Sequence, residues 1–156
     1  MLFDKLARLA SRRPPPMPDP MRRHLAMAVL LAETARADFA DQGAERQEMR
    51  RLLVSALGLA ATEVDALVER AFDRSRAAIS LHEFLATLNG ELDSATKVQL
   101  LEWLWRIAFA DGELDPLEEA RIRQIADWLF VPHSDFIRTK LQVIEASADR
   151  SHVRRA

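Results

Sequence analysis

An acidic run between two helical segments holds the residues of this chain best suited to chemistry. Residues 111–119 contain five carboxylates in nine positions and no lysine or arginine, namely Asp111, Glu113, Asp115, Glu118 and Glu119. Calcium and magnesium prefer oxygen ligands, and Gly112 allows the backbone to turn tightly enough to add carbonyl ligands. The run therefore indicates a divalent-cation site, although it lacks the full spacing of a calcium-binding loop.

Two other interpretations of the same run remain open. In the first, Asp115 caps the helix that follows, Glu118 completes a capping box and Glu119 adds favourable charge to the first turn. Gly112 would then end the preceding helix in a left-handed conformation. In the second, the run is an acidic docking surface for a basic partner. The capping interpretation leaves Asp111 and Glu113 without a role.

A weaker acidic segment lies 73 residues upstream. With that shift Asp38 aligns with Asp111, and Glu45 aligns with Glu118. We therefore expect two related halves, each made of a helix, an acidic turn and two further helices. Phe39 stands where the downstream turn has glycine, so the downstream turn is the better candidate site, with Asp38 contributing from the first half.

Helix start and stop signals recur along the chain, and the alternating pattern of β-strands is absent. The boundaries predict helices over residues 20–39, 45–57, 62–76, 80–90 and 93–110, a sixth from 115 and a seventh from 134. Thr62 and Ser80 open capping-box-like starts, and Asn89-Gly90 is a helix stop. The sequence predicts an all-α, compact bundle of about seven helices with short connections. The aromatic residues expected in its core are Trp103, Trp105, Trp128, Phe130 and Phe136, with the alternative that one of the adjacent-turn tryptophans, Trp103 or Trp105, is exposed at an interface.

The chain divides into four parts. Residues 1–11 form a short amphipathic pattern, 12–20 a proline-rich linker, 21–147 the helical domain and 148–156 a flexible basic tail. Leu2, Phe3, Leu6 and Leu9 lie near one face of the first segment, which is too short to be a stable helix alone. We expect it to dock on the domain, on a second copy in a homodimer, or peripherally on a membrane surface.

Composition excludes several classes of function. The 156 residues suit one domain, and a net charge of −2 gives no basic field for nucleic acid. The chain has no cysteine, its four histidines are scattered, and its four glycines form no phosphate loop. No stretch approaches the ~20 apolar residues of a membrane span. We expect a cytoplasmic protein without enzymatic activity.

Around the acidic run the chain resembles the TerB family, the tellurite-resistance-associated helical domains that are also attached to some DnaJ-type co-chaperones. The resemblance rests on Ala-Asp-Gly-x-x-Asp-x-x-Glu at residues 110–118, with Ala37-Asp38 as a weaker copy, and covers roughly residues 24–146. It implies a bundle of about seven helices. It also implies a divalent-cation site, for calcium or magnesium, on Asp38, Asp111, Glu113, Asp115 and Glu118.

The function implied by this resemblance is a non-enzymatic binding module associated with tellurite resistance and metal stress, with a protein partner of unknown identity. The alternative is a pure protein–protein interaction module, co-chaperone-like or a scaffold, without a metal site. The two differ in whether a cation stabilises the fold.

Overall fold

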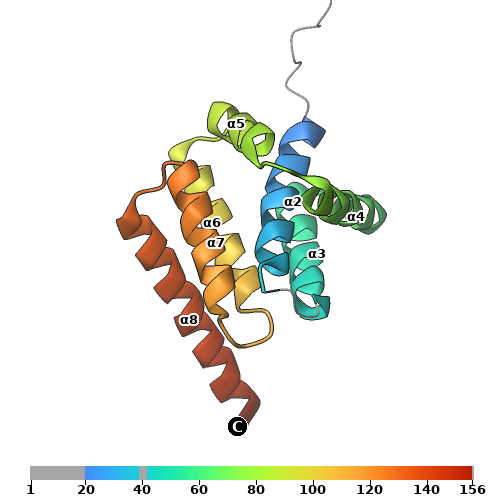
Figure 1. The fold of residues 1–156 in the computed structure, drawn as a ribbon. Helices are drawn as coiled ribbons and strands as arrows, with labels where there is room; N and C mark the ends of the chain where they lie inside the picture. Colours follow the sequence, from blue (N-terminus) through green and yellow to red (C-terminus); the bar gives the residue numbers. More distant parts are fainter. Residues whose placement is uncertain (1–19, 39–41, 156) are drawn as a thin grey trace, which may run out of the picture.

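The protein is a bundle of helices, shown in Figure 1, in a computed structural model that describes residues 20–38 and 42–155. Within these ranges it has seven helices and no strand, which confirms the predicted all-α class. They are α2 (Pro20–Arg36), α3 (Gly43–Leu57), α4 (Ala61–Ala77), α5 (His82–Glu91), α6 (Ser94–Ala108), α7 (Pro116–Trp128) and α8 (His133–Arg155). The expected N-terminal helix, residues 1–11, and residues 12–19 of the linker lie outside the described residues. None of the helices described is long and apolar enough to cross a membrane.

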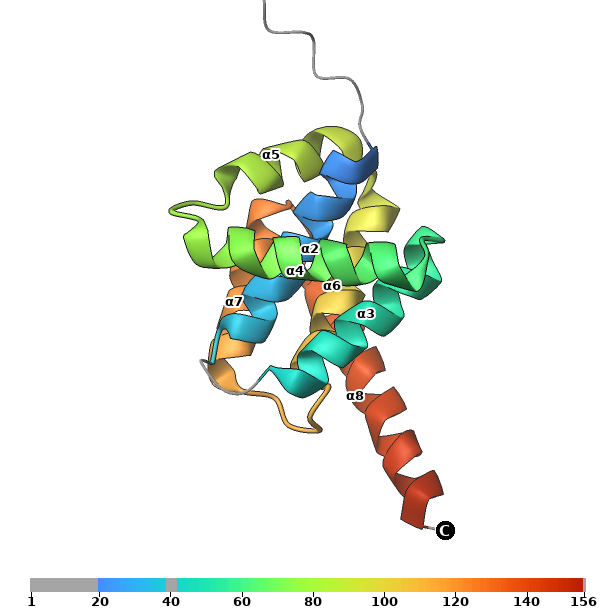
Figure 2. The ribbon, with the colours of Figure 1, turned by 90° about the vertical axis from the view of Figure 1, so that its right-hand side faces the viewer.

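Helix α2 is the centre of the bundle. Every residue from 26 to 35 is buried, so this helix is covered on all sides. It contacts α3, α4, α5, α6 and α7, and Figure 2 shows α4 crossing over it. The remaining helices are therefore arranged around one central segment rather than in two separate layers.

Helix α8 closes the other side of α6 and α7. Trp105 of α6 is fully buried, with its ring centroid 5.1 Å from that of Phe136 in α8. The indole Nε1 donates to the hydroxyl of Thr139 at 3.1 Å, so the buried polar atom of this large side chain is satisfied. Beyond this contact α8 continues as a helix to Arg155, through most of the stretch expected to be a tail (Figure 1).

Several helix boundaries follow the capping chemistry read from the sequence. Asp93 accepts a hydrogen bond from the backbone N–H of Thr96 at 2.7 Å, and Asp115 accepts one from that of Leu117 at 2.7 Å. Gly58 follows α3 with φ 64°, the left-handed conformation that glycine adopts without strain. These three positions confirm the predicted helix ends.

Other boundaries differ from the prediction. Helix α4 begins at Ala61 after an N-cap residue, Ala60, that has no side-chain cap, so Thr62 is inside the helix. Helix α5 passes through Gly90 and ends at Glu91. The side-chain amide of Asn89 donates to the backbone carbonyl of Trp128 at 3.0 Å and so joins α5 to α7 instead of ending its own helix.

Of the five aromatic residues expected in the core, Trp103 is partly buried against it, and the other four divide into two pairs. Trp105 and Phe136 are buried, whereas Trp128 is 41% exposed and Phe130 is 79% exposed. Both exposed rings lie at the C-terminal end of α7, where the chain leaves the bundle for the link to α8. The core prediction is therefore wrong for this pair.

Candidate metal site

Two inter-helix turns meet at one end of the molecule. The first joins α2 to α3 and the second joins α6 to α7; Figure 2 shows the end of α2 and the start of α3 at the same end of the molecule as the link between α6 and α7. Because α2 and α6 are in contact, as are α3 and α6, their ends bring the two turns together. The two acidic segments, 73 residues apart in sequence, are thereby placed side by side.

Three carboxylates converge between these turns. Asp38, Glu45 and Glu118 each offer an oxygen within 4.8 Å of those of the other two. Glu45 is the third residue of α3 and Glu118 the third residue of α7, and their exposed fractions are only 2% and 0%. Both lie in the first turn of a helix, where the helix dipole favours negative charge.

Glu118 is the most unusual member of this acidic cluster. Both of its carboxylate oxygens are buried with no hydrogen-bond partner among the described residues. Burial, the largest cause, and the neighbouring carboxylates Asp38, Glu45, Asp111 and Asp115 together raise the pKa of Glu118 to about 9. A buried carboxylate in such surroundings requires either a proton or a cation.

The remaining residues of the predicted site have other contacts. Asp111 accepts a hydrogen bond from the backbone N–H of Glu113 at 3.0 Å, within a turn in which Gly112 has φ 91°. Asp115 caps α7, and Glu113 is exposed to solvent. None of these three belongs to the cluster of three carboxylates, although Asp111 and Asp115 are close enough to act on the pKa of Glu118.

The structure agrees with one part of the capping interpretation and contradicts the other. Asp115 is an N-cap as that interpretation requires, but Glu118 forms no hydrogen bond back to the start of the helix and points into the acidic cluster. Glu119 has a different contact, an ion pair with the side chain of Lys140 at 2.7 Å. The capping box is therefore absent, and helix capping does not explain Glu118.

Glu45 is the one member of the cluster absent from the ligand set implied by the sequence. Its signal was present in the 73-residue alignment, which places Glu45 on Glu118. The alignment predicts a contribution from Asp38 of the first half but does not by itself place Glu45 beside Glu118. Only the packing of α3 against α6 shows that both first-turn glutamates reach one point.

The fold and the cluster together define a class of protein: a small all-helical domain in which two acidic inter-helix turns close on a buried carboxylate cluster. The chain belongs to the TerB family, since the family model described as tellurite resistance protein TerB matches residues 24–141. This confirms the resemblance drawn from the acidic run, and the matched range contains all three residues of the cluster. Comparison with curated proteins and with solved structures gave no significant match.

Proposed function

We propose that this TerB domain is a non-enzymatic binding module that holds one divalent cation between its two acidic turns. Asp38, Glu45 and Glu118 are the direct ligands, and Asp111 and Asp115 add negative charge around them. The observation that carries the proposal is the carboxylate of Glu118, which is fully buried without a hydrogen-bond partner in the described chain and faces two further carboxylates. A cation at this point would remove the cost of that burial.

The donor set favours a hard cation. All three ligands are carboxylates, and calcium accepts six to eight oxygens in flexible geometry, with some carboxylates bidentate and water completing the shell. No cysteine is present and no histidine is in the cluster, so the set offers nothing to softer metals. Calcium is therefore the first candidate and magnesium the second.

Cation binding at this site competes with a proton. Because the pKa of Glu118 is about 9, the cation-free protein holds a proton there at neutral pH, and the cation displaces it. Cation affinity therefore increases as the pH rises toward 9. The bound cation joins the start of α3 to the start of α7 and so fixes the relative position of the two turns.

The family connects this chemistry with a biological setting. Its model is that of a tellurite resistance protein, and we extend this association with metal stress to the present chain. In this setting the domain acts by binding partners, and its cation-loaded turns are the regulated feature. Cytoplasmic location is part of the same proposal.

Thermal unfolding of the full chain tests the cation site. After chelator treatment, the midpoint is measured alone and with millimolar calcium, magnesium or manganese, for wild type, Glu118→Gln and Glu113→Gln. A ligand at about 100 times its Kd adds about 2.7 kcal/mol of stability, which is a rise of several degrees for a domain of this size. We expect this rise in wild type and in Glu113→Gln, and its loss in Glu118→Gln.

The two variants form a matched pair. Each removes one carboxylate from the same acidic run, but only Glu118 belongs to the cluster. If no cation stabilises wild type, or if Glu118→Gln is stabilised as much as wild type, the cation site is wrong. The domain is then a protein–protein interaction module without a metal.

A further inference from the structure

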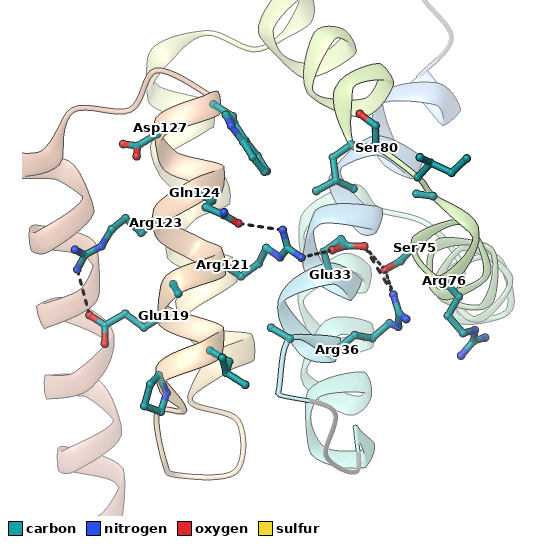
Figure 3. Close-up of a pocket in the computed structure, with 18 residues that line it drawn as sticks. Glu33, Arg36, Ser75, Arg76, Ser80, Glu119, Arg121, Arg123, Gln124 and Asp127 are labelled. Carbon is teal, nitrogen blue, oxygen red and sulfur yellow. Dashed lines mark hydrogen bonds and ion pairs between the residues drawn. The ribbon is translucent and has the colours of Figure 1, made fainter.

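A concave region lies away from the acidic cluster, between α7 and the ends of α2 and α4. It is a groove of about 1050 Å³, lined on one side by α7 and on the other by the last turn of α2, the end of α4 and the link to α5 (Figure 3). None of the three residues of the acidic cluster lines it. The groove therefore needs an explanation of its own.

Four arginines line this groove: Arg36, Arg76, Arg121 and Arg123. The carboxylate of Glu33 lies between Arg36 and Arg121 (Figure 3). It accepts a hydrogen bond from the hydroxyl of Ser75 at 2.7 Å and forms ion pairs with Arg36 at 3.7 Å and with Arg121 at 3.4 Å. This network joins α2, α4 and α7 and holds two of the guanidinium groups at fixed positions.

Three carboxylates line the groove against its four arginines: Glu33 and Glu119 are engaged by the protein itself, and Asp127 is exposed. The side chain of Glu33 is only 11% exposed, and Glu119 pairs with Lys140, which is outside the groove, at 2.7 Å. Arg76 and Arg123, by contrast, are 47% and 57% exposed. A guanidinium has five N–H donors, so an arginine with one intramolecular ion pair can still bind a further carboxylate.

Large apolar side chains accompany these arginines. Ile79, in the link between α4 and α5, is fully exposed, and Leu117 and Trp128 of α7 are about half exposed. Single exposed apolar residues are ordinary, but all three of these line the same groove. Tryptophan and arginine are also the residues most enriched among the energetic centres of protein interfaces.

We propose that this groove docks an acidic peptide segment of a partner protein, with an apolar side chain of that segment between its aspartates or glutamates. Charge complementarity selects this occupant: guanidinium groups receive the carboxylates, and Ile79 and Trp128 receive the apolar side chain. Residues 1–13 of the chain itself are basic, with Lys5, Arg8, Arg12 and Arg13 against one aspartate, so they do not match the groove.

Selection of peptides on the full chain tests this proposal without a known partner. Random 12-residue peptides displayed on phage are selected against the biotinylated protein, and the enriched sequences are synthesised and measured by fluorescence anisotropy. We expect enrichment in Asp and Glu beside Leu, Ile, Phe or Trp. We also expect affinity to fall at least about tenfold in Arg76→Glu and in Ile79→Asp, the size of loss typical of an interface centre.

Arg138→Glu is the matched control. Arg138 is 51% exposed and pairs with Asp135 at 2.8 Å with i, i+3 spacing, as Arg76 pairs with Asp73 at 2.8 Å, but it is outside the groove. Both charge reversals disturb one exposed helix pair, so only their effect on peptide affinity should differ. Basic peptides, no enrichment, or peptides that bind wild type and the groove variants equally would overturn the proposal.

The groove and the cation site can fail separately. Peptide affinity is measured in chelator and again in millimolar calcium, with wild type and Glu118→Gln. Peptides that depend on Arg76 and Ile79 support the groove even if calcium never stabilises the protein. A calcium-dependent rise in the unfolding midpoint supports the cation site even if no peptide is enriched.

Discussion

Glu118 combines complete burial with four neighbouring carboxylates, and its ionisation therefore affects folding directly. The folded protein holds its proton up to pH about 9, whereas the unfolded chain releases it near the ordinary value of 4.5. Between these values the folded state binds one proton more than the unfolded state, so stability decreases as the pH rises. The stability associated with this proton is fully present below pH about 4.5 and is lost as the pH passes 9.

Urea unfolding in chelator from pH 5 to 8 measures this effect. A single proton gives a slope of about 1.4 kcal/mol per pH unit. We expect the free energy of unfolding of wild type to fall more steeply with pH than that of Glu118→Gln, which has no proton to lose there. Equal slopes in the two proteins would show that Glu118 ionises normally.

For single residues, the sequence predicts which side chains could bind a cation better than it predicts which of them lie close together. The type and spacing of the carboxylates identified Asp38 and Glu118 as ligands of a candidate site, and the structure brings the two together. Glu45 was not among them, because its neighbours in space depend on how α3 packs against α6. Asp111 is exposed and its side chain accepts a hydrogen bond within its own turn, a local contact that residue type alone does not predict.

Among the elements, the C-terminal end of α7 departs most from local preference. Phe130 has φ 58°, and its N–H donates to Asp127 while that of Val131 donates to Ala126, which is the Schellman pattern that normally ends in glycine. An L-residue in this conformation costs about 1–2 kcal/mol. Packing of Phe130 compensates little of this cost, because the residue is 79% exposed. Its ring contacts the Lys97 ammonium only weakly, with the nitrogen 5.9 Å from the ring centroid.

We therefore expect Phe130→Gly to raise the free energy of unfolding by about 0.5–1 kcal/mol.

Gly58→Ala is the opposite change at the end of α3. The φ of Gly58 is 64° and an added Cβ meets no atom within 4 Å, so only backbone strain should act. It should lower stability by about 1 kcal/mol. Chemical denaturation of both variants gives the comparison, and a loss of stability in Phe130→Gly would show that the aromatic ring packs on the domain.

Helix ends were predictable where one side chain decides them, as at Asp93, Asp115 and Gly58. They were not predictable where packing decides. Thr62 and Gly90 are conventional boundary residues, but each lies one residue inside the end of its helix, and the nearest buried residues, Val64 and Leu88, lie two residues further in. Asn89, whose type predicts a helix stop, instead holds α5 against α7. Local preference is overridden at these positions by tertiary contacts.

For the molecule as a whole, helix α7 carries both candidate surfaces. Glu118 points into the acidic cluster, whereas Leu117 and Trp128 face the groove. The sequence predicts the number of helices because each helix has a local start or stop signal within a few residues of its end. It does not predict which helices become neighbours. A run of apolar residues such as 26–32 indicates that the helix is buried, but not which other helices pack against it. The groove was not anticipated for this reason, as its lining comes from three separate parts of the chain.

The central position of α2 also determines how the chain can be divided. Five helices rest on this one segment, including two that follow it in sequence by more than 50 residues. A cut in the link between α5 and α6 would leave residues 93–156 without their central helix, and residues 1–92 with the apolar surface of α2 that α6 and α7 normally cover. Neither piece should be able to bury a sufficient core alone.

We expect each fragment to show little helical circular dichroism separately and to recover most of the helical signal when the two are mixed. Independent folding of residues 93–156 would contradict this. If the expectation holds, the domain cannot be divided between residues 92 and 93 into two parts that fold separately. A chain shortened to either half could then persist only by finding the missing helices in another molecule, which makes exchange of segments between copies the natural outcome of truncation.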